Sequence, residues 1–277
     1  MERQKLKRII IPWDFTEVPE NALKYAFAMS SKDKSEFELV HVLVKGGILL
    51  SKEKENPDDV MELLKKDTVR IKKEYSVDVK VKILEGSLFD AISDYATEVE
   101  ASLVVMGTHG IVGMQKFLGS NALKVIEGSN VPFIVVQQAP ETTLLFKEIV
   151  FPIDYRDEVK EMLVWASELN GIYGSKINIV IQQETDSAIR HKVDNNLAFC
   201  EKYFDIHSVP YEVHLVPKTK HFYKELIFQA KNLKSDLIFI MITKNIDLSD
   251  YIWGAQEQHI IANEFKIPVL CINPSMI

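Results

Sequence analysis

Two kinds of hydrophobic pattern alternate along the first half of the chain. Short apolar runs rich in β-branched residues lie between longer segments in which apolar residues recur at helical spacing. Several of the short runs are apolar nearly throughout, which is typical of parallel strands that helices cover on both faces. We therefore predict five strands, at Arg8–Trp13, Phe37–Leu43, Asp78–Ile83, Ser102–Met106 and Phe133–Gln137.

Signals for the start of a helix separate these strands. Pro19 favours the first turn of one helix, and Asp58 with Asp59 can open a second. Ser87 and Ser120 are candidate N-caps of a third and a fourth. Strands that alternate with helices predict right-handed crossovers, and hence a doubly wound parallel sheet of the α/β class.

The second half of the chain repeats this plan. The segment Ile10–Phe15 returns as Val150–Tyr155, so that Asp154 follows Asp14 by 140 positions. A repeat at such long spacing indicates duplicated domains rather than a solenoid. We expect two domains, at 1–139 and 145–277, joined by a short polar linker around 137–143. The strands predicted for the second domain are Ile149–Ile153, Lys176–Ile181, Tyr211–Val216, Asp236–Met241 and Pro268–Ile272.

Composition narrows the class of protein. The 277 residues are 47% hydrophobic and 26% charged, which is ordinary for a globular protein, and no apolar run approaches the length of a membrane helix. The net charge of −7 disfavours a nucleic-acid partner. The first residues are charged and lack the apolar core of a signal peptide, and Cys200 and Cys271 suggest no disulfide framework. We therefore expect a cytoplasmic protein without a membrane partner.

Glycines gather at one strand end in the first half. Gly107 and Gly110 follow the fourth predicted strand, and Gly119 and Ser120 open the next helix. In open α/β sheets ligands bind beyond the carboxyl ends of the strands, and a helix N-terminus favours an anion. Asp14, just past the first strand, is placed to accept hydrogen bonds from a sugar or a base. This pattern predicts a phosphate-bearing ligand, although a purely structural set of turns would also explain it.

The corresponding positions of the second half have lost this character. Asp154 is kept, but we expect Ile242 in place of the first glycine, Asn245 in place of the second, and Gln182 where the first half has Val42. We interpret the second half as a degenerate copy with a structural role.

These motifs resemble the universal stress protein family in its tandem form, over nearly the whole chain. The resemblance rests on residues 9–17, on Leu39–Val42 and on the stretch from Gly107 to Val136. The family signature is Gly, two residues, Gly, nine residues, then Gly-Ser or Gly-Thr; here only eight residues separate Gly110 from Gly119. Trp13 stands where the family usually has a smaller residue, and its indole either stacks on a base or fills the pocket.

The resemblance implies a fold, a ligand and a site. It implies Rossmann-like domains with strand order 3-2-1-4-5, which form an intramolecular pseudo-dimer by pairing Val131–Val136 with Ile267–Ile272. It implies that the first domain binds an adenine nucleotide (ATP, ADP or AMP), with Mg²⁺ at the phosphates. The residues that it assigns to this ligand are Pro12, Trp13, Asp14, Val42, Met106, Gly107, Gly110, Gly119, Ser120 and Asn121.

The function expected is that of a stress-response sensor or regulator with unidentified protein partners and, as one possibility, further homodimerisation. No carboxylate pair, cysteine–histidine couple or nucleoside-triphosphatase motif accompanies the glycines, so we assign no catalytic residue and no metal ligand. The spacing of His207, His214 and His221 is too wide for one metal site along a strand. Two alternatives stay open: a scaffold of the same fold that binds no nucleotide, and a slow ATPase or phosphotransferase.

Overall fold

The chain folds around one continuous sheet of ten strands. The computed structural model describes residues 7–30, 35–44, 56–108, 126, 129–156, 159–242 and 251–273. The strands are ordered β3-β2-β1-β4-β5-β10-β9-β6-β7-β8. The first half contributes β1 Arg8–Pro12, β2 Glu36–Val44, β3 Val79–Gly86, β4 Leu103–Gly107 and β5 Phe133–Val136. The second half contributes β6 Glu148–Ile153, β7 Lys176–Gln182, β8 Tyr211–Val216, β9 Leu237–Met241 and β10 Val269–Ile272.

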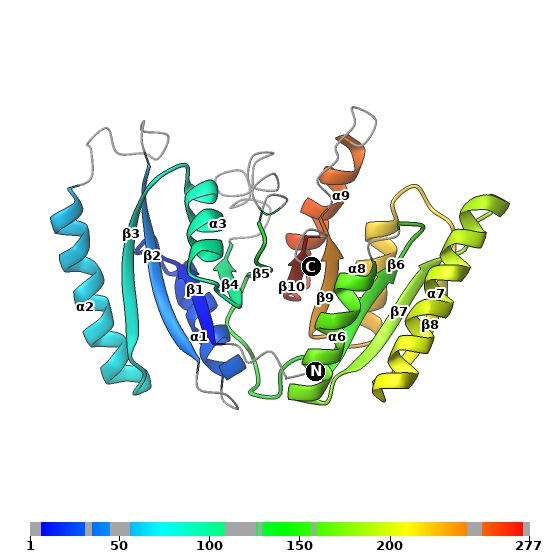
Figure 1. Cartoon of the computed structure of the whole chain (residues 1–277), viewed down its shortest axis with the longest axis horizontal. Coiled ribbons are helices and arrows are strands. Elements are labelled where there is room, and N and C mark those ends of the chain that lie inside the picture. The colour runs from blue at the N-terminus through cyan, green and yellow to red at the C-terminus, as the bar shows by residue number, and fades with distance from the viewer. Residues whose placement is uncertain are drawn as a thin grey trace.

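The two halves share one topology and meet at their fifth strands (Figure 1). Within each half all pairings are parallel and follow the expected order 3-2-1-4-5. Between the halves β5 and β10 run antiparallel, with Ile134 opposite Leu270. The predicted pairing of the fifth strands inside one chain is therefore confirmed, and it covers two apolar strand edges that would otherwise be open.

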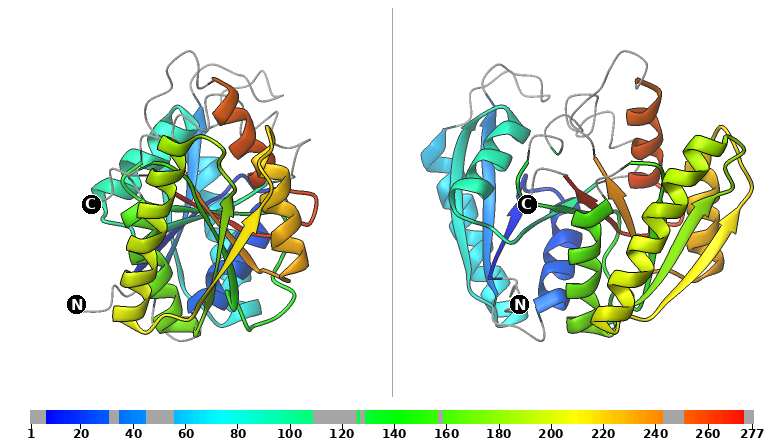
Figure 2. Two further views of the ribbon diagram at one scale, coloured as in Figure 1. Left: turned by 90° about the vertical axis from the view of Figure 1, so that its right-hand side faces the viewer. Right: turned by 45° about the vertical axis from the view of Figure 1, so that its right-hand side comes forward.

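Helices cover both faces of the sheet (Figure 2). In the first half these are α1 Val18–Ser30, α2 Pro57–Tyr75 and α3 Leu88–Glu98. In the second half they are α6 Val159–Tyr173, α7 Ser187–His207, α8 Phe222–Asn232 and α9 Tyr251–Ile261. Asp58 and Asp59 lie in the first turn of α2, as predicted, and Asn56 is its N-cap: the side-chain oxygen of Asn56 accepts the hydrogen bond from the backbone N–H of Asp58 (3.0 Å). Ser87 does occupy the N-cap position of α3.

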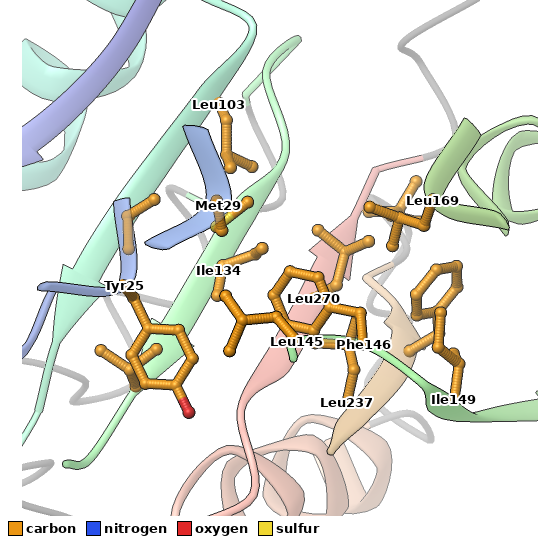
Figure 3. Packing of buried hydrophobic residues seen from close by; sticks show 14 of the residues in the cluster. Tyr25, Met29, Leu103, Ile134, Leu145, Phe146, Ile149, Leu169, Leu237 and Leu270 are labelled. Atoms are coloured by element: carbon orange, nitrogen blue, oxygen red, sulfur yellow. The ribbon is translucent and has the colours of Figure 1, made fainter. Parts of the chain in front are cut away.

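Alternation along the strands divides the core into two layers. Ile9 and Ile11 of β1 face a cluster shared with α1, α2, α6 and α7, which we call the first core. Ile10 faces the opposite cluster, shared with α3 and α8, which we call the second core. The first core runs from one half into the other, where Tyr25 and Met29 lie near Leu145, Phe146 and other buried residues (Figure 3).

Polar contacts cross the junction in a reciprocal way. Gln137 and Asn273 are the residues that directly follow β5 and β10. The amide of Gln137 donates to the carbonyls of Ile261 and Asn263 (3.3 and 2.9 Å), while that of Asn273 donates to the carbonyl of Ile126 (3.2 Å). On the other face of the sheet the hydroxyl of Tyr173 donates to the carbonyl of Met29 (2.7 Å). Each half thus satisfies backbone carbonyls of the other.

Candidate functional site

Three of the predicted site residues lie together at the carboxyl ends of neighbouring strands. In the sheet β1 lies between β2 and β4, with Pro12 opposite Val40 and Ile10 opposite Val104. Because side chains alternate along a strand, Pro12, Val42 and Met106 share the face of the second core. This is the point at which the winding direction of the sheet reverses, which is where open α/β sheets bind ligands.

Asp14 lies just beyond β1 and is held by a tight turn. Its Oδ1 accepts hydrogen bonds from the backbone N–H of Thr16 (3.0 Å) and from the Thr16 hydroxyl (2.6 Å). The turn places Phe15 in the left-handed region, with φ of 61°, which is costly for an aromatic residue. The ring of Phe15 lies 5.0 Å from that of His41. The carboxylate is thereby oriented through one oxygen and is only partly buried.

The side chain of Trp13 points to the opposite face of the sheet. It is 3% exposed, belongs to the first core, and its Nε1–H donates to Oδ2 of Asp67 on α2 (2.8 Å). The backbone carbonyl of Trp13 accepts a hydrogen bond from Nδ1 of buried His41 (2.8 Å). The indole therefore fills the core between β1 and α2, and it offers little surface on which a base could stack.

Gly107 is required by packing within the chain. A Cβ at this position would lie 2.4 Å from the carbonyl oxygen of Val18 and 2.7 Å from its Cγ1. The backbone of Gly107 is not in the left-handed region, so close approach rather than a special φ demands glycine here. The start of α1 therefore lies against the end of β4. A contact of Gly107 with a ligand stays a prediction.

The rest of the predicted glycine segment, Gly110, Gly119, Ser120 and Asn121, falls outside the described residues. At its edge Thr108 is 1% exposed, and its backbone N–H donates to the carbonyl of Val136 (2.8 Å). Among the residues that the structure describes, the Thr108 hydroxyl has no hydrogen-bond partner. Neither Thr108 nor Thr16 is among the site residues predicted from the sequence, although the position of Thr16 two residues after Asp14 is a signal for this kind of turn.

The second half differs at the corresponding strand ends. Both carboxylate oxygens of Asp154 are engaged by Arg156, whose backbone N–H donates to Oδ1 (2.8 Å) and whose Nε donates to Oδ2 (2.7 Å). The side-chain amide of Asn196 on α7 donates to the carbonyls of Asp154 and Arg156 (2.8 and 2.7 Å), which fixes this turn. Arg156 stands where the first half has Thr16. A guanidinium within the chain thus neutralises the second aspartate.

Strand pairing corrects one expected correspondence between the halves. In the first half Gly107 lies opposite Val136, and in the second half Met241 lies opposite Ile272. Because β5 and β10 occupy equivalent places, Met241 rather than Ile242 is the counterpart of Gly107. The conclusion that a side chain replaces the glycine is unaffected. Gln182 does occupy the place of Val42, and its side-chain carbonyl accepts from the backbone N–H of Thr219 (3.1 Å).

Two of the histidines of the second half make hydrogen bonds within the chain. Nδ1 of His207 donates to the carbonyl of Tyr203 (2.8 Å), and Nε2 of His214 makes a hydrogen bond to Oδ1 of Asn178 (3.1 Å). Within the described ranges, no group of three or more His, Cys, Asp and Glu side chains is arranged to hold a metal ion. Nor does any helix in this part of the chain have the length and apolar character needed to cross a bilayer.

Several solved protein structures have the same fold as this chain. A universal stress protein from Archaeoglobus fulgidus superposes with a TM-score of 0.72 over 97% of both chains at 16% identity. A protein of unknown function from Pseudomonas aeruginosa superposes with a TM-score of 0.66 over 98% of this chain and 94% of its own, at 13% identity. At these identities the likeness concerns the fold alone, a duplicated α/β domain.

The sequence defines the family more closely. The sequence profile of the universal stress protein family matches residues 5–137. A universal stress protein of Methanocaldococcus jannaschii is 32% identical over 154 residues, covering 48% of this chain and 95% of that protein. A second one from the same organism is 29% identical over 140 residues, covering 48% of this chain and 82% of that protein. The chain belongs to the universal stress protein family.

Proposed function

We propose that the first half binds an adenine nucleotide at the carboxyl ends of β1, β2 and β4. In this proposal the chain is a cytoplasmic sensor or regulator in a stress response, and nucleotide occupancy changes the surface that it offers to protein partners. The observation that carries the proposal is the placement of Pro12, Val42 and Met106 on one face of the sheet, with Asp14 directly beyond them. Membership of the universal stress protein family supports the same ligand.

The side chains at the carboxyl ends of β1, β2 and β4 have the chemistry needed to bind the base and the ribose. The buried side chains of Val42 and Met106 give this end of the sheet an apolar character, as in most small-molecule sites. The carboxylate of Asp14 is an acceptor for the exocyclic amine of adenine or for a ribose hydroxyl. Thr16 holds one oxygen of this carboxylate and so sets its direction. The phosphates, with Mg²⁺ bound to them, fall to the predicted segment Gly107–Asn121.

The second half is not proposed to bind the same ligand. Arg156 engages Asp154, and Met241 brings a side chain to the place of Gly107. The guanidinium–carboxylate contact measures 2.7 Å, and a ligand would have to displace it. Charge-assisted contacts of this kind are about twice as strong as neutral hydrogen bonds. We therefore expect one nucleotide per chain.

Calorimetric titration with ATP, ADP and AMP tests this proposal on two matched variants. Asp14→Asn keeps an oxygen for Thr16 but removes the charge, and we expect it to weaken binding about tenfold or more, since a hydrogen bond to a charged group contributes roughly 1.5–3 kcal/mol. Asp154→Asn makes the same change in the second half and should leave the affinity as it was. Absence of binding by the parent chain at millimolar nucleotide would reject the proposal in favour of a scaffold that acts through protein contacts.

Hydrolysis is a separate question with its own measurement. If the chain were a slow ATPase, purified protein would release phosphate from ATP, and Gly119→Val would abolish the release. We expect no turnover above the background of the Gly119→Val protein, because the sequence shows no catalytic group beside the glycines.

A further inference from the structure

The duplication poses a problem of strand sorting during folding. The central strands of the two halves have nearly the same apolar pattern: Ile9–Ile11 of β1 and Ile149–Phe151 of β6 are all buried. Hydrophobic pattern is what normally selects the neighbours and register of a strand. Homologous domains in one chain are accordingly prone to misassembly and domain swapping. Apolar residues alone would scarcely distinguish β6 from β1 as a neighbour for β2.

In the first half three charged residues form a row near the amino ends of β1, β2 and β3. Glu36 is the direct cross-strand partner of Arg8, and its Oε2 lies 3.6 Å from the Arg8 guanidinium. The same oxygen lies 2.8 Å from Nζ of Lys80 on the other side. The hydrogen bond from Lys80, reinforced by the charge of Arg8, lowers the pKa of Glu36. The row reads positive, negative, positive.

In the second half the equivalent row carries the opposite signs. Lys176 is the direct cross-strand partner of Glu148, and its Nζ lies 2.6 Å from Oε2 of Glu212. The hydrogen bond to Glu212, together with the charges of Glu212 and Glu148, raises the pKa of Lys176. The strand registers are the same in the two halves, since Phe37 pairs with Val79 where Ile177 pairs with Tyr211. All three positions have therefore reversed sign together.

We infer that the two reversed charge rows sort the strands, so that each strand pairs within its own half during folding. A strand that takes the equivalent place in the wrong half meets a like charge instead of an opposite one, and like charges directly opposite each other destabilise a sheet. The wrong-half neighbours would be Arg8 or Lys80 beside Lys176, and Glu148 or Glu212 beside Glu36. Glu36, Lys80 and Glu212 are exposed, and Arg8, Glu148 and Lys176 are half-buried, so the pairs add little to the stability of the native state. Their effect is on the difference in free energy between strand pairing within one half and strand pairing between the halves.

Refolding of two charge-reversed variants tests this inference. The triple variant R8E/E36K/K80E gives the first half the signs of the second, which keeps opposite charges between position 36 and positions 8 and 80 but removes the penalty for exchange. Lys80 also pairs directly with Glu38, and the like-charge pair that K80E creates there is common to both variants. The sixfold variant R8E/E36K/K80E/E148R/K176E/E212K reverses both rows and restores the opposition. The sixfold variant is a matched control, because it contains every local change of the triple variant, including loss of the contact between Arg8 and the carbonyl of Val99.

The measurement is the fraction of native monomer recovered after dilution from urea, by size-exclusion chromatography and near-ultraviolet circular dichroism. We expect the triple variant to recover about threefold less native monomer than the parent chain, because each exposed charge pair shifts a population by roughly 1.5- to 5-fold. The missing protein should appear as swapped dimers and misfolded monomers. The sixfold variant should recover more native monomer than the triple variant, although it also loses the hydrogen bond from the Asn178 amide to Glu148. A triple variant that refolds like the parent, or a sixfold variant that refolds as poorly as the triple one, would overturn the inference.

Discussion

Gly107 is a glycine for a reason that lies inside the protein. The first turn of α1 approaches the end of β4 so closely that a Cβ would strike the carbonyl oxygen of Val18. In the sequence, a glycine after the fourth predicted strand indicates a nearby ligand. The structure shows that the same residue is needed to bring α1 against β4, and α1 begins just after the turn that orients Asp14. Packing within the chain alone therefore requires glycine at this position, and the predicted contact with a ligand would require it as well.

Replacement of Gly107 by alanine should therefore destabilise the chain even without a ligand. We expect Gly107→Ala to lower the free energy of unfolding by about 1–3 kcal/mol, because overpacking against backbone cannot be relieved by a rotamer change. Gly171 in α6 is the matched control, since nothing lies within 4 Å of a Cβ placed there. Gly171→Ala should stabilise the chain by roughly 0.5–1 kcal/mol through helix propensity. Urea unfolding measures the change in the free energy of unfolding for both variants. Equal changes in the two would contradict the packing argument.

Glu168 on α6 predicts a pH dependence of stability. Burial raises its pKa from the ordinary 4.5 to about 7. The folded chain therefore binds a proton that the unfolded chain releases between these values, so stability is highest at low pH within this window and falls as the pH rises toward 7. Glu168→Gln should flatten this part of the profile and be more stable than the parent above pH 7. Thermal unfolding from pH 5 to 8 measures the effect, with Glu62→Gln on the exposed side of α2 as the reference substitution.

At the scale of the element, sequence pattern predicts the strands well, because strands buried on both faces are uninterrupted apolar runs and the edge strands β3 and β8 alternate between apolar and polar residues. The predicted strand 8–13 and the observed β1 differ by one residue, and all ten predicted strands are present. The pattern could not show that Trp13 turns away from the site, since the deciding partner, Asp67, lies on a helix 54 positions later. Nor did it match Met241 to Gly107, because aligning the methionines Met106 and Met241 shifts the second half by one residue, and strand pairing reveals this shift.

The start of α2 offers a test at this scale. Asn56 has extended backbone angles, and its side-chain oxygen accepts from the N–H of Asp58, so it satisfies a donor that the helix leaves open. Asn56→Ala should cost about 1 kcal/mol of unfolding free energy, whereas Asn56→Ser keeps an acceptor and should cost less than half of that. Urea denaturation of the two variants distinguishes a cap from a passive loop residue. Equal losses would show that the side-chain oxygen is not what stabilises the helix.

At the scale of the whole molecule, the two halves form one core rather than two tethered bodies. The first core includes Met29 from one half and Leu270 from the other, and β5 and β10 pair directly (Figure 3). Separate unfolding of either half would expose this shared surface and open the β5–β10 ladder. We therefore regard the junction as part of the fold, held by burial and by the reciprocal amides of Gln137 and Asn273.

Truncation of Gln137 should weaken the whole molecule. Its amide donates to two carbonyls of the other half, and Gln137→Ala leaves both without this donor. We expect a loss of about 1–2 kcal/mol in unfolding free energy, with the transition remaining a single one. The neighbouring Gln138 bonds only to exposed Glu141 among the described residues, so Gln138→Ala should change the free energy by less than about 0.5 kcal/mol. Scanning calorimetry of both variants separates the outcomes, and a second endotherm in Gln137→Ala would contradict a shared core.

Joining two copies of one domain in a single polypeptide has an evolutionary consequence. In a dimer of identical subunits every substitution appears twice, at both symmetry-related places. In this chain Arg156 could arise at the position equivalent to Thr16, and Glu148 at the position equivalent to Arg8, without a change in the other half. The peptide link between β5 and β6 therefore lets one copy change its sequence independently of the other, which a dimer of identical subunits does not allow.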